Sequence, residues 1–133
     1  RVVSPNGHDF VDGEFRLLEG ELANGFPVWK KIDGDLYMYT TNGGSLEWGM
    51  WYVGDQDERN VNFDCCYGFI RHSTCHSGKM PCEMSSSWEL WDERIADWVV
   101  DKEMAVRTLG TWDHLIRIMR LGLQDSSASK APP

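Results

Sequence analysis

The sequence predicts an all-β protein, mainly an antiparallel sandwich or barrel-like arrangement, with one C-terminal α-helix. Two observations predict the strands. From Gly13 to about Val106, short apolar runs alternate with turn clusters at the intervals typical of all-β domains. In the run Trp48-Gly-Met50-Trp-Tyr52, odd and even positions are expected to point to opposite faces of a strand. A third observation predicts the helix, because apolar residues recur at helical spacing in the last quarter of the chain.

The composition fits one folded domain. Of the 133 residues, 41% are hydrophobic and 26% are charged, which is enough apolar material for a packed core. Lys and Arg number 13 against 21 Asp and Glu, so the formal net charge is −8. This balance argues against a nucleic-acid partner, because a protein that binds nucleic acid needs a basic face to neutralise the phosphates. No apolar run is long enough to predict a transmembrane segment.

Four segments are expected along the chain. Residues 1–12 form a polar N-terminal extension, and residues 13–109 form a Trp-rich antiparallel β domain. Residues 110–124 form the C-terminal helix, and residues 125–133 form a tail of Ser, Ala and Pro that is typical of a free end.

Seven strands are expected inside the β domain. They are Glu14–Leu18, Pro27–Lys31, Leu36–Thr40, Glu47–Val53, Tyr67–Arg71, Ser87–Trp91 and Trp98–Val100. Asn24-Gly25 and Asp33-Gly34 contain residues that tolerate positive φ, so turns are expected at both places. Asp33-Gly34, which lies between two apolar runs, is also a hairpin signal.

The C-terminal helix has a broad apolar surface. Thr111 is its expected N-cap, and apolar side chains occupy more than one stripe after it. Two interpretations remain open: the helix closes the open end of the β core, or it also binds a partner protein. In the second case the partner-binding residues are Trp112, Leu115, Ile116, Arg117, Met119 and Arg120.

Four cysteines lie close together in the sequence: Cys65, Cys66, Cys75 and Cys82, with His72 and His76 among them. Their spacing contains no C-x-x-C knuckle, which argues against a zinc site. Disulfides and reduced thiols both remain open. No signature of a thiol enzyme surrounds these cysteines. We therefore expect no metal, no cofactor and no enzymatic activity.

A series of short motifs resembles a known module. Their order is Asn24-Gly-Phe-Pro-Val-Trp-Lys30, Asp35-Leu-Tyr-Met-Tyr39, Trp51-Tyr-Val-Gly54, Gly68-Phe-Ile70, Pro81 and Trp88-Glu-Leu-Trp91. This order resembles the Trp/Tyr-rich β module N-G-x-P-V-[YW]-K … W-x-[IV]-G of algal, dinoflagellate, apicomplexan and marine-invertebrate proteins, over roughly residues 13 to 100. The resemblance implies a binding or scaffolding domain and carries over no catalytic residue.

Large aromatic rings are expected to fill the core of so small a β domain. We predict that Trp29, Tyr37, Trp51 and Trp88, which lie in the expected strands, are mostly buried. The alternative is that some rings form an exposed platform for a sugar, a peptide or another protein.

These observations favour a non-catalytic protein-interaction or scaffold module, an accessory subunit whose partners are other protein subunits. The chain begins at Arg1 rather than Met. That start suits a processed subunit imported into an organelle, plastid or mitochondrion, and bound at the periphery of a respiratory or photosynthetic membrane complex. The main alternative is a glycan- or peptide-binding module that uses exposed aromatic residues.

Overall fold

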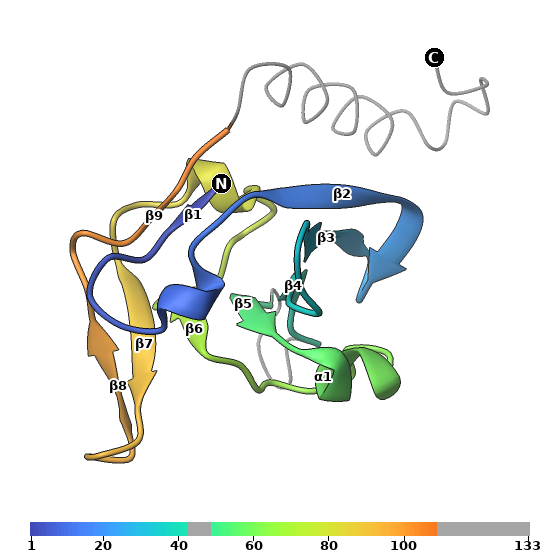
Figure 1. Ribbon diagram of the computed structural model, residues 1–133. Coiled ribbons are helices and arrows are strands. Elements are labelled where there is room, and N and C mark those ends of the chain that lie inside the picture. Colours follow the sequence, from blue (N-terminus) through green and yellow to red (C-terminus); the bar gives the residue numbers. More distant parts are fainter. Residues whose placement is uncertain (43–48, 109–133) are drawn as a thin grey trace.

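The protein is mostly β-sheet. A computed structural model describes residues 1–42 and 49–108, which form two antiparallel sheets (Figure 1). In the larger sheet, seven strands pair in chain order, each with the next. They are β2 (Phe15–Ala23), β3 (Phe26–Lys31), β4 (Tyr37–Thr40), β5 (Trp51–Gly54), β6 (Ile70–His72), β7 (Trp88–Asp92) and β8 (Asp97–Val100). Each overlaps one of the seven predicted strands, so the prediction of antiparallel β structure is confirmed.

Both predicted turns are present. Asn24 and Gly25 have φ values of 53° and 88° and join β2 to β3 directly after the pair Ala23↔Phe26. These left-handed conformations suit the twist of a two-residue hairpin and are tolerated by Asn and Gly. The β3–β4 hairpin turns over Asp33-Gly34, and the Lys31 N–H donates to the Leu36 carbonyl at 2.8 Å.

The first residues of the chain contribute to the core. The second sheet pairs β1 (Val2–Val3) with β9 (Ala105–Val106), and Val2 also bridges Gly13. Val2 and Val11, the latter at the end of the short 3₁₀ helix Asp9–Val11, are buried. Residues 1–12, which we expected to form a polar extension, are therefore part of the folded domain and pair with its last described strand.

The register of the large sheet separates its side chains into two faces. Because alternate residues of a strand point to opposite sides, Trp29, Met38, Val53 and Ile70 share one face, which we call the Trp face. The opposite side, the Tyr face, carries Tyr37, Tyr39, Tyr52, Arg71, Glu89 and Trp98.

The predicted aromatic core is confirmed. The exposed fractions of Trp29, Tyr37, Trp51 and Trp88 are 7%, 2%, 0% and 1%. Each face of the sheet carries a cluster of buried side chains. The Trp-face cluster includes Trp29, Trp51 and Trp88, and the Tyr-face cluster includes Tyr37. Bulky rings on both sides of one sheet account for most of the aromatic content of the described chain.

Different segments cover the two faces. Val2, Val11, Met80 and Met104 pack onto the Trp face. Phe63, which follows helix α1 (Gln56–Asn60), packs onto the Tyr face with Tyr37 and Tyr39.

The α-helix of the described part lies in mid-chain, not at the C-terminus. Segments 110–124 and 125–133, for which we expected a helix and a tail, lie outside the described residues. The six predicted partner-binding residues lie there too, and the described part does not bear out a C-terminal helix. No helix among the described residues is long and apolar enough to cross a membrane.

Candidate functional site

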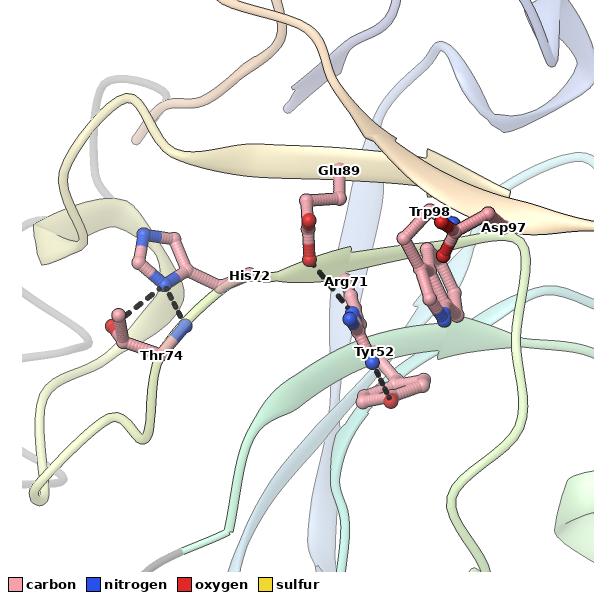
Figure 2. Close-up of polar contacts among 7 residues, drawn as sticks. All are labelled: Tyr52, Arg71, His72, Thr74, Glu89, Asp97 and Trp98. Atoms are coloured by element: carbon pink, nitrogen blue, oxygen red, sulfur yellow. Dashed lines mark hydrogen bonds and ion pairs between the residues drawn. The ribbon is translucent and has the colours of Figure 1, made fainter. Parts of the chain in front are cut away.

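A polar network lies on the Tyr face, near the β8 end of the sheet (Figure 2). Tyr52, Arg71 and Glu89 are direct cross-strand neighbours on β5, β6 and β7. The Arg71 Nε donates to the Glu89 carboxylate at 2.8 Å, and its guanidinium also donates to the Tyr52 hydroxyl at 3.1 Å. Side chains from three successive strands are thus joined by one arginine.

Arg71 also contacts an indole ring. Its guanidinium carbon lies 4.3 Å from the ring centre of Trp98 on β8, which is the geometry of a cation–π contact. Burial disfavours the arginine charge, but the hydrogen bonds with Tyr52 and Glu89 more than offset this, so the pKa of Arg71 is raised above its ordinary value. The network therefore contains a permanent positive charge.

Trp98 packs edge-on against two other rings. Its ring centre lies 5.4 Å from that of Trp91, its cross-strand partner, at an interplanar angle of 67°. Tyr52 lies 5.7 Å away at 81°. With Arg71 over the Trp98 ring as well, this cluster fixes the position of β8 rather than displaying flat, parallel rings.

Strand β8 is one edge of the seven-stranded sheet. The Asp101 N–H donates to the Trp88 carbonyl at 3.0 Å, which makes these residues a hydrogen-bonded pair. Because such pairs alternate along an antiparallel ladder, Trp98 and Val100 fall in the non-hydrogen-bonded positions opposite Trp91 and Glu89. Their main-chain groups are therefore directed away from β7, toward the open edge.

The open edge carries exposed apolar side chains and one acidic side chain, that of Asp97, which binds an outward N–H. Ile95, Val99 and Val100 have exposed fractions of 60%, 36% and 50%. The Asp97 carboxylate accepts the outward N–H of Trp98 at 2.8 Å. Among the described residues, no strand pairs with β8 on this side.

The other edge of the same sheet is protected. Strand β2 contains a register shift between Leu17 and Leu22, and Gly20 in this stretch has a φ of 78°. Glu19 and Glu21 add exposed charges. Irregular geometry and charge are the usual means by which proteins prevent pairing at a sheet edge. Strand β8 lacks the irregularity.

The two histidines near the cysteines are structural. His76 is buried, exchanges a hydrogen bond with the Thr40 hydroxyl at 2.8 Å and accepts the Gly78 N–H at 2.9 Å. Burial lowers its pKa to about 4, so its ring is neutral at pH 7. His72 is also buried, and its Nδ1 accepts the Thr74 N–H at 3.1 Å.

The structure does not gather the cysteines. No disulfide joins Cys65, Cys66, Cys75 and Cys82, which all lie in the described part. Cys65 packs against the Tyr-face cluster, 3.5 Å from the Tyr39 hydroxyl. Cys82 packs against the Trp-face cluster. The sheet therefore lies between these two thiols.

The acidic group at the start of α1 is a helix cap. Asp55, Asp57 and Glu58 lie within 4.8 Å of one another and are the potential metal-ligand group found among the described residues. The Asp55 carboxylate accepts the Asp57 N–H, and the Glu58 carboxylate accepts the Asp55 N–H. These bonds form a capping box, which explains the cluster without an ion.

A small hollow, open to solvent, lies at the β1–β9 end of the molecule. Its lining is Arg1, Val2, Phe15, Trp29, Met38, Pro81, Cys82, Val106, Arg107 and Thr108. Thr108 is the last described residue, so the hollow lies where the chain continues into the predicted partner-binding segment 110–124.

Three residues of this region were not predicted from the sequence as site residues: Arg71, Glu89 and Asp97. A usable signal was present for the first two, since each is a charged residue inside a predicted strand with apolar or aromatic neighbours. Their pairing depends on the register between β6 and β7, which the sequence pattern leaves open.

Comparison with known proteins identifies no relative: no family model, no curated protein and no solved structure matches this chain. The resemblance to the Trp/Tyr-rich module therefore stays a prediction.

Proposed function

We propose that this protein is a non-catalytic interaction module, an accessory subunit that binds a protein partner through the β8 edge. One observation carries the proposal: Val99 and Val100 are exposed on a regular edge strand whose outward main-chain groups at Trp98 and Val100 have no strand partner among the described residues. Such an edge is a template for pairing with another chain.

The contrast between the two edges supports this proposal. Within the same sheet, β2 is blunted by a register shift and by charge, whereas β8 is regular and carries two exposed valines. An exposed edge of this kind is an aggregation hazard unless a partner covers it. A binding role gives a physical reason why β8 is regular and exposed.

The aromatic cluster favours a protein over a glycan. Sugar-binding sites use exposed, flat rings on which a pyranose can stack. Here Trp91 and Trp98 pack edge to face, and Arg71 lies over the Trp98 ring. The cluster is therefore better suited to holding the edge strand rigid than to stacking on a sugar.

The proposal extends to the assembly expected from the sequence. We propose that segment 110–124 adds a second contact, because it continues from Thr108 beside the hollow and carries apolar residues on more than one stripe. An acidic module with two contacts suits a subunit at the periphery of a larger complex, organellar membrane complexes included.

The test compares equivalent substitutions at the two edges. The full chain carries Val100→Lys at the β8 edge or, as the matched control, Leu22→Lys at the β2 edge, where Leu22 is also exposed, at 63% against 50% for Val100. Each variant is purified from its native cells under mild conditions, and co-purifying proteins are quantified by mass spectrometry. We expect a stoichiometric partner with the wild type and the control that is lost with Val100→Lys.

Two results would overturn the proposal. The first is a wild-type chain that purifies as a monomer from its native cells, and the second is a partner retained equally by all three proteins. Specific, saturable binding to an oligosaccharide array would instead establish the glycan-binding alternative.

A further inference from the structure

We propose that β8 accepts an extended segment bearing lysine or arginine as an eighth strand of the sheet, and that Asp97 selects this segment by its charge. This inference rests on the proposed function, because it names the chemistry of the partner at the same edge.

The main chain of β8 supplies the pairing groups. At Trp98 and Val100, the N–H and carbonyl groups are directed away from β7, as the Asp101–Trp88 hydrogen bond requires. The Asp97 carboxylate holds the Trp98 N–H at 2.8 Å, in the place that a carbonyl of an added strand would take. The carboxylate therefore makes the hydrogen bond to Trp98 that a neighbouring strand would otherwise make.

The side chains define what each face of the added strand contacts. Trp98 and Val100 lie on the Tyr face, and Asp97 and Val99 lie on the Trp face. Apolar residues of the partner would therefore lie beside Val100 and the Trp98 indole. Residues of the opposite parity would lie beside Asp97 and Val99.

Charge complementarity determines the kind of partner. The stretch 89–103 contains six acidic and two basic residues. Glu89 is paired with Arg71 and Asp92 with Arg94, while Asp97 is exposed and has no ion pair among the described residues. A cation placed directly across from Asp97 is therefore stabilising, and an anion there is destabilising.

A second copy of this chain fits less well. The antiparallel self-pairing that uses both outward positions sets Trp98 of one copy opposite Val100 of the other. Asp97 then lies opposite Asp101 at both ends of the contact. Like charges directly across a strand pair are destabilising, and the two chains each carry a net charge of −8.

The test uses defined peptides and the full chain. Four probes are synthesised with blocked ends: a seven-residue peptide that alternates Lys and Val, the same peptide with Glu for Lys, and two N-methylated forms of the first, one methylated at all Val residues and the other at all Lys residues. Binding is measured by calorimetry, and hydrogen exchange of the Val100 amide is followed by NMR.

We expect the Lys/Val peptide to bind and to slow exchange of the Val100 amide at least tenfold at saturation. The Glu/Val peptide should bind more weakly. One of the two N-methylated forms should lose binding, because an added strand presents alternate amides to its neighbour. Binding without protection of Val100, or equal binding of all the peptides, overturns strand addition at β8.

Two variants test the roles of charge and main chain separately. Asp97→Asn keeps an oxygen that accepts the Trp98 N–H but removes the charge, so the preference for Lys over Glu peptide should fall about twofold to fivefold. Val100→Pro removes the outward N–H without removing a bond to β7, and it should abolish binding. An unchanged preference in Asp97→Asn overturns selection by charge, whatever Val100→Pro does.

The outcomes separate this inference from the proposed function. Loss of the native partner in Val100→Lys without binding of the Lys/Val peptide leaves the interaction module in place and overturns the basic partner segment. Self-association of the full chain through β8, seen by sedimentation and abolished by Val100→Lys, overturns the partner segment in favour of a second copy.

Discussion

The Trp face and the Tyr face of the large sheet differ in how completely they are covered. On the Trp face, segments from the N-terminus, the loop around Met80 and the region before β9 surround Trp51 and Trp88 with apolar side chains. On the Tyr face, Phe63 covers the part over β4 and β5, while over β6 to β8 the Arg71–Glu89 pair and Trp98 are partly open to solvent. The closed face accounts for stability, and the open part of the Tyr face adjoins the β8 edge, where we propose that a partner binds.

Replacing a ring on the closed face should have the largest effect. Trp51→Ala removes a side chain with no exposed surface and its N–H bond to the Lys79 carbonyl. We expect the free energy of unfolding to fall by about 3–5 kcal/mol, measured by urea denaturation. Val99→Ala, at the exposed edge, is the control and should cost less than about 0.5 kcal/mol. An unchanged midpoint of urea denaturation for Trp51→Ala would contradict the conclusion that the closed face accounts for stability.

Acid should also weaken the closed face, through His76. Its pKa is about 4 in the folded protein and about 6.5 in the unfolded chain. The unfolded state therefore binds more protons between these values, so this group's contribution is present above pH 6.5 and is lost as pH falls toward 4. The full loss is about 3 kcal/mol.

Urea denaturation between pH 7 and pH 4 measures this dependence. His76→Asn serves as the comparison, because it removes the titrating ring while carboxylate titrations remain in both proteins. The wild type should lose stability more steeply than the variant in this window. Parallel curves for the two proteins would show that His76 does not contribute.

The polar network on the open face should contribute less. Arg71→Ala leaves the Glu89 carboxylate without its ion pair and removes the contact with Trp98. Because both side chains of the pair are only partly buried, we expect a loss of about 2 kcal/mol. A double-mutant cycle with Glu89→Gln measures the coupling, and a coupling energy of zero would remove the pair from the account of β8 rigidity.

Removal of residues 109–133 should have the smallest effect on folding. The strand pairings of the described part end at Val106, so the truncated chain should keep its near-ultraviolet circular dichroism and unfold within about 0.5 kcal/mol of the full chain. A loss as large as that of Trp51→Ala would instead place segment 110–124 in the core and would support the interpretation of a helix that closes it.

Much of the fold followed from local signals. The Asn24-Gly25 turn, the Asp33-Gly34 hairpin and the short apolar runs were enough to predict seven strands in order, because turn residues and strand residues have opposite backbone preferences. The burial of Trp29, Tyr37, Trp51 and Trp88 followed from ring size together with their places in the expected strands, since a small domain has few other side chains large enough to fill its interior.

The candidate site depended on contacts between distant residues. Arg71 and Glu89 are 18 residues apart, and Val2 and Val106 are 104 apart. Such pairs meet because of the register between strands and the pairing of the first strand with the last described one. Neither can be predicted from the spacing of residues within a short segment.

The sequence by itself determined the antiparallel β structure, the approximate places of the seven strands of the larger sheet and of two turns, and four of the buried rings. The tertiary structure decided which edge of the sheet is open, that a neutral His76 packs against Trp51, and that Asp97 covers an outward amide of β8. The reason is physical. Backbone preference and hydrophobicity act on each residue where it stands in the chain, whereas pairing, burial and exposure depend on which segments become neighbours after folding.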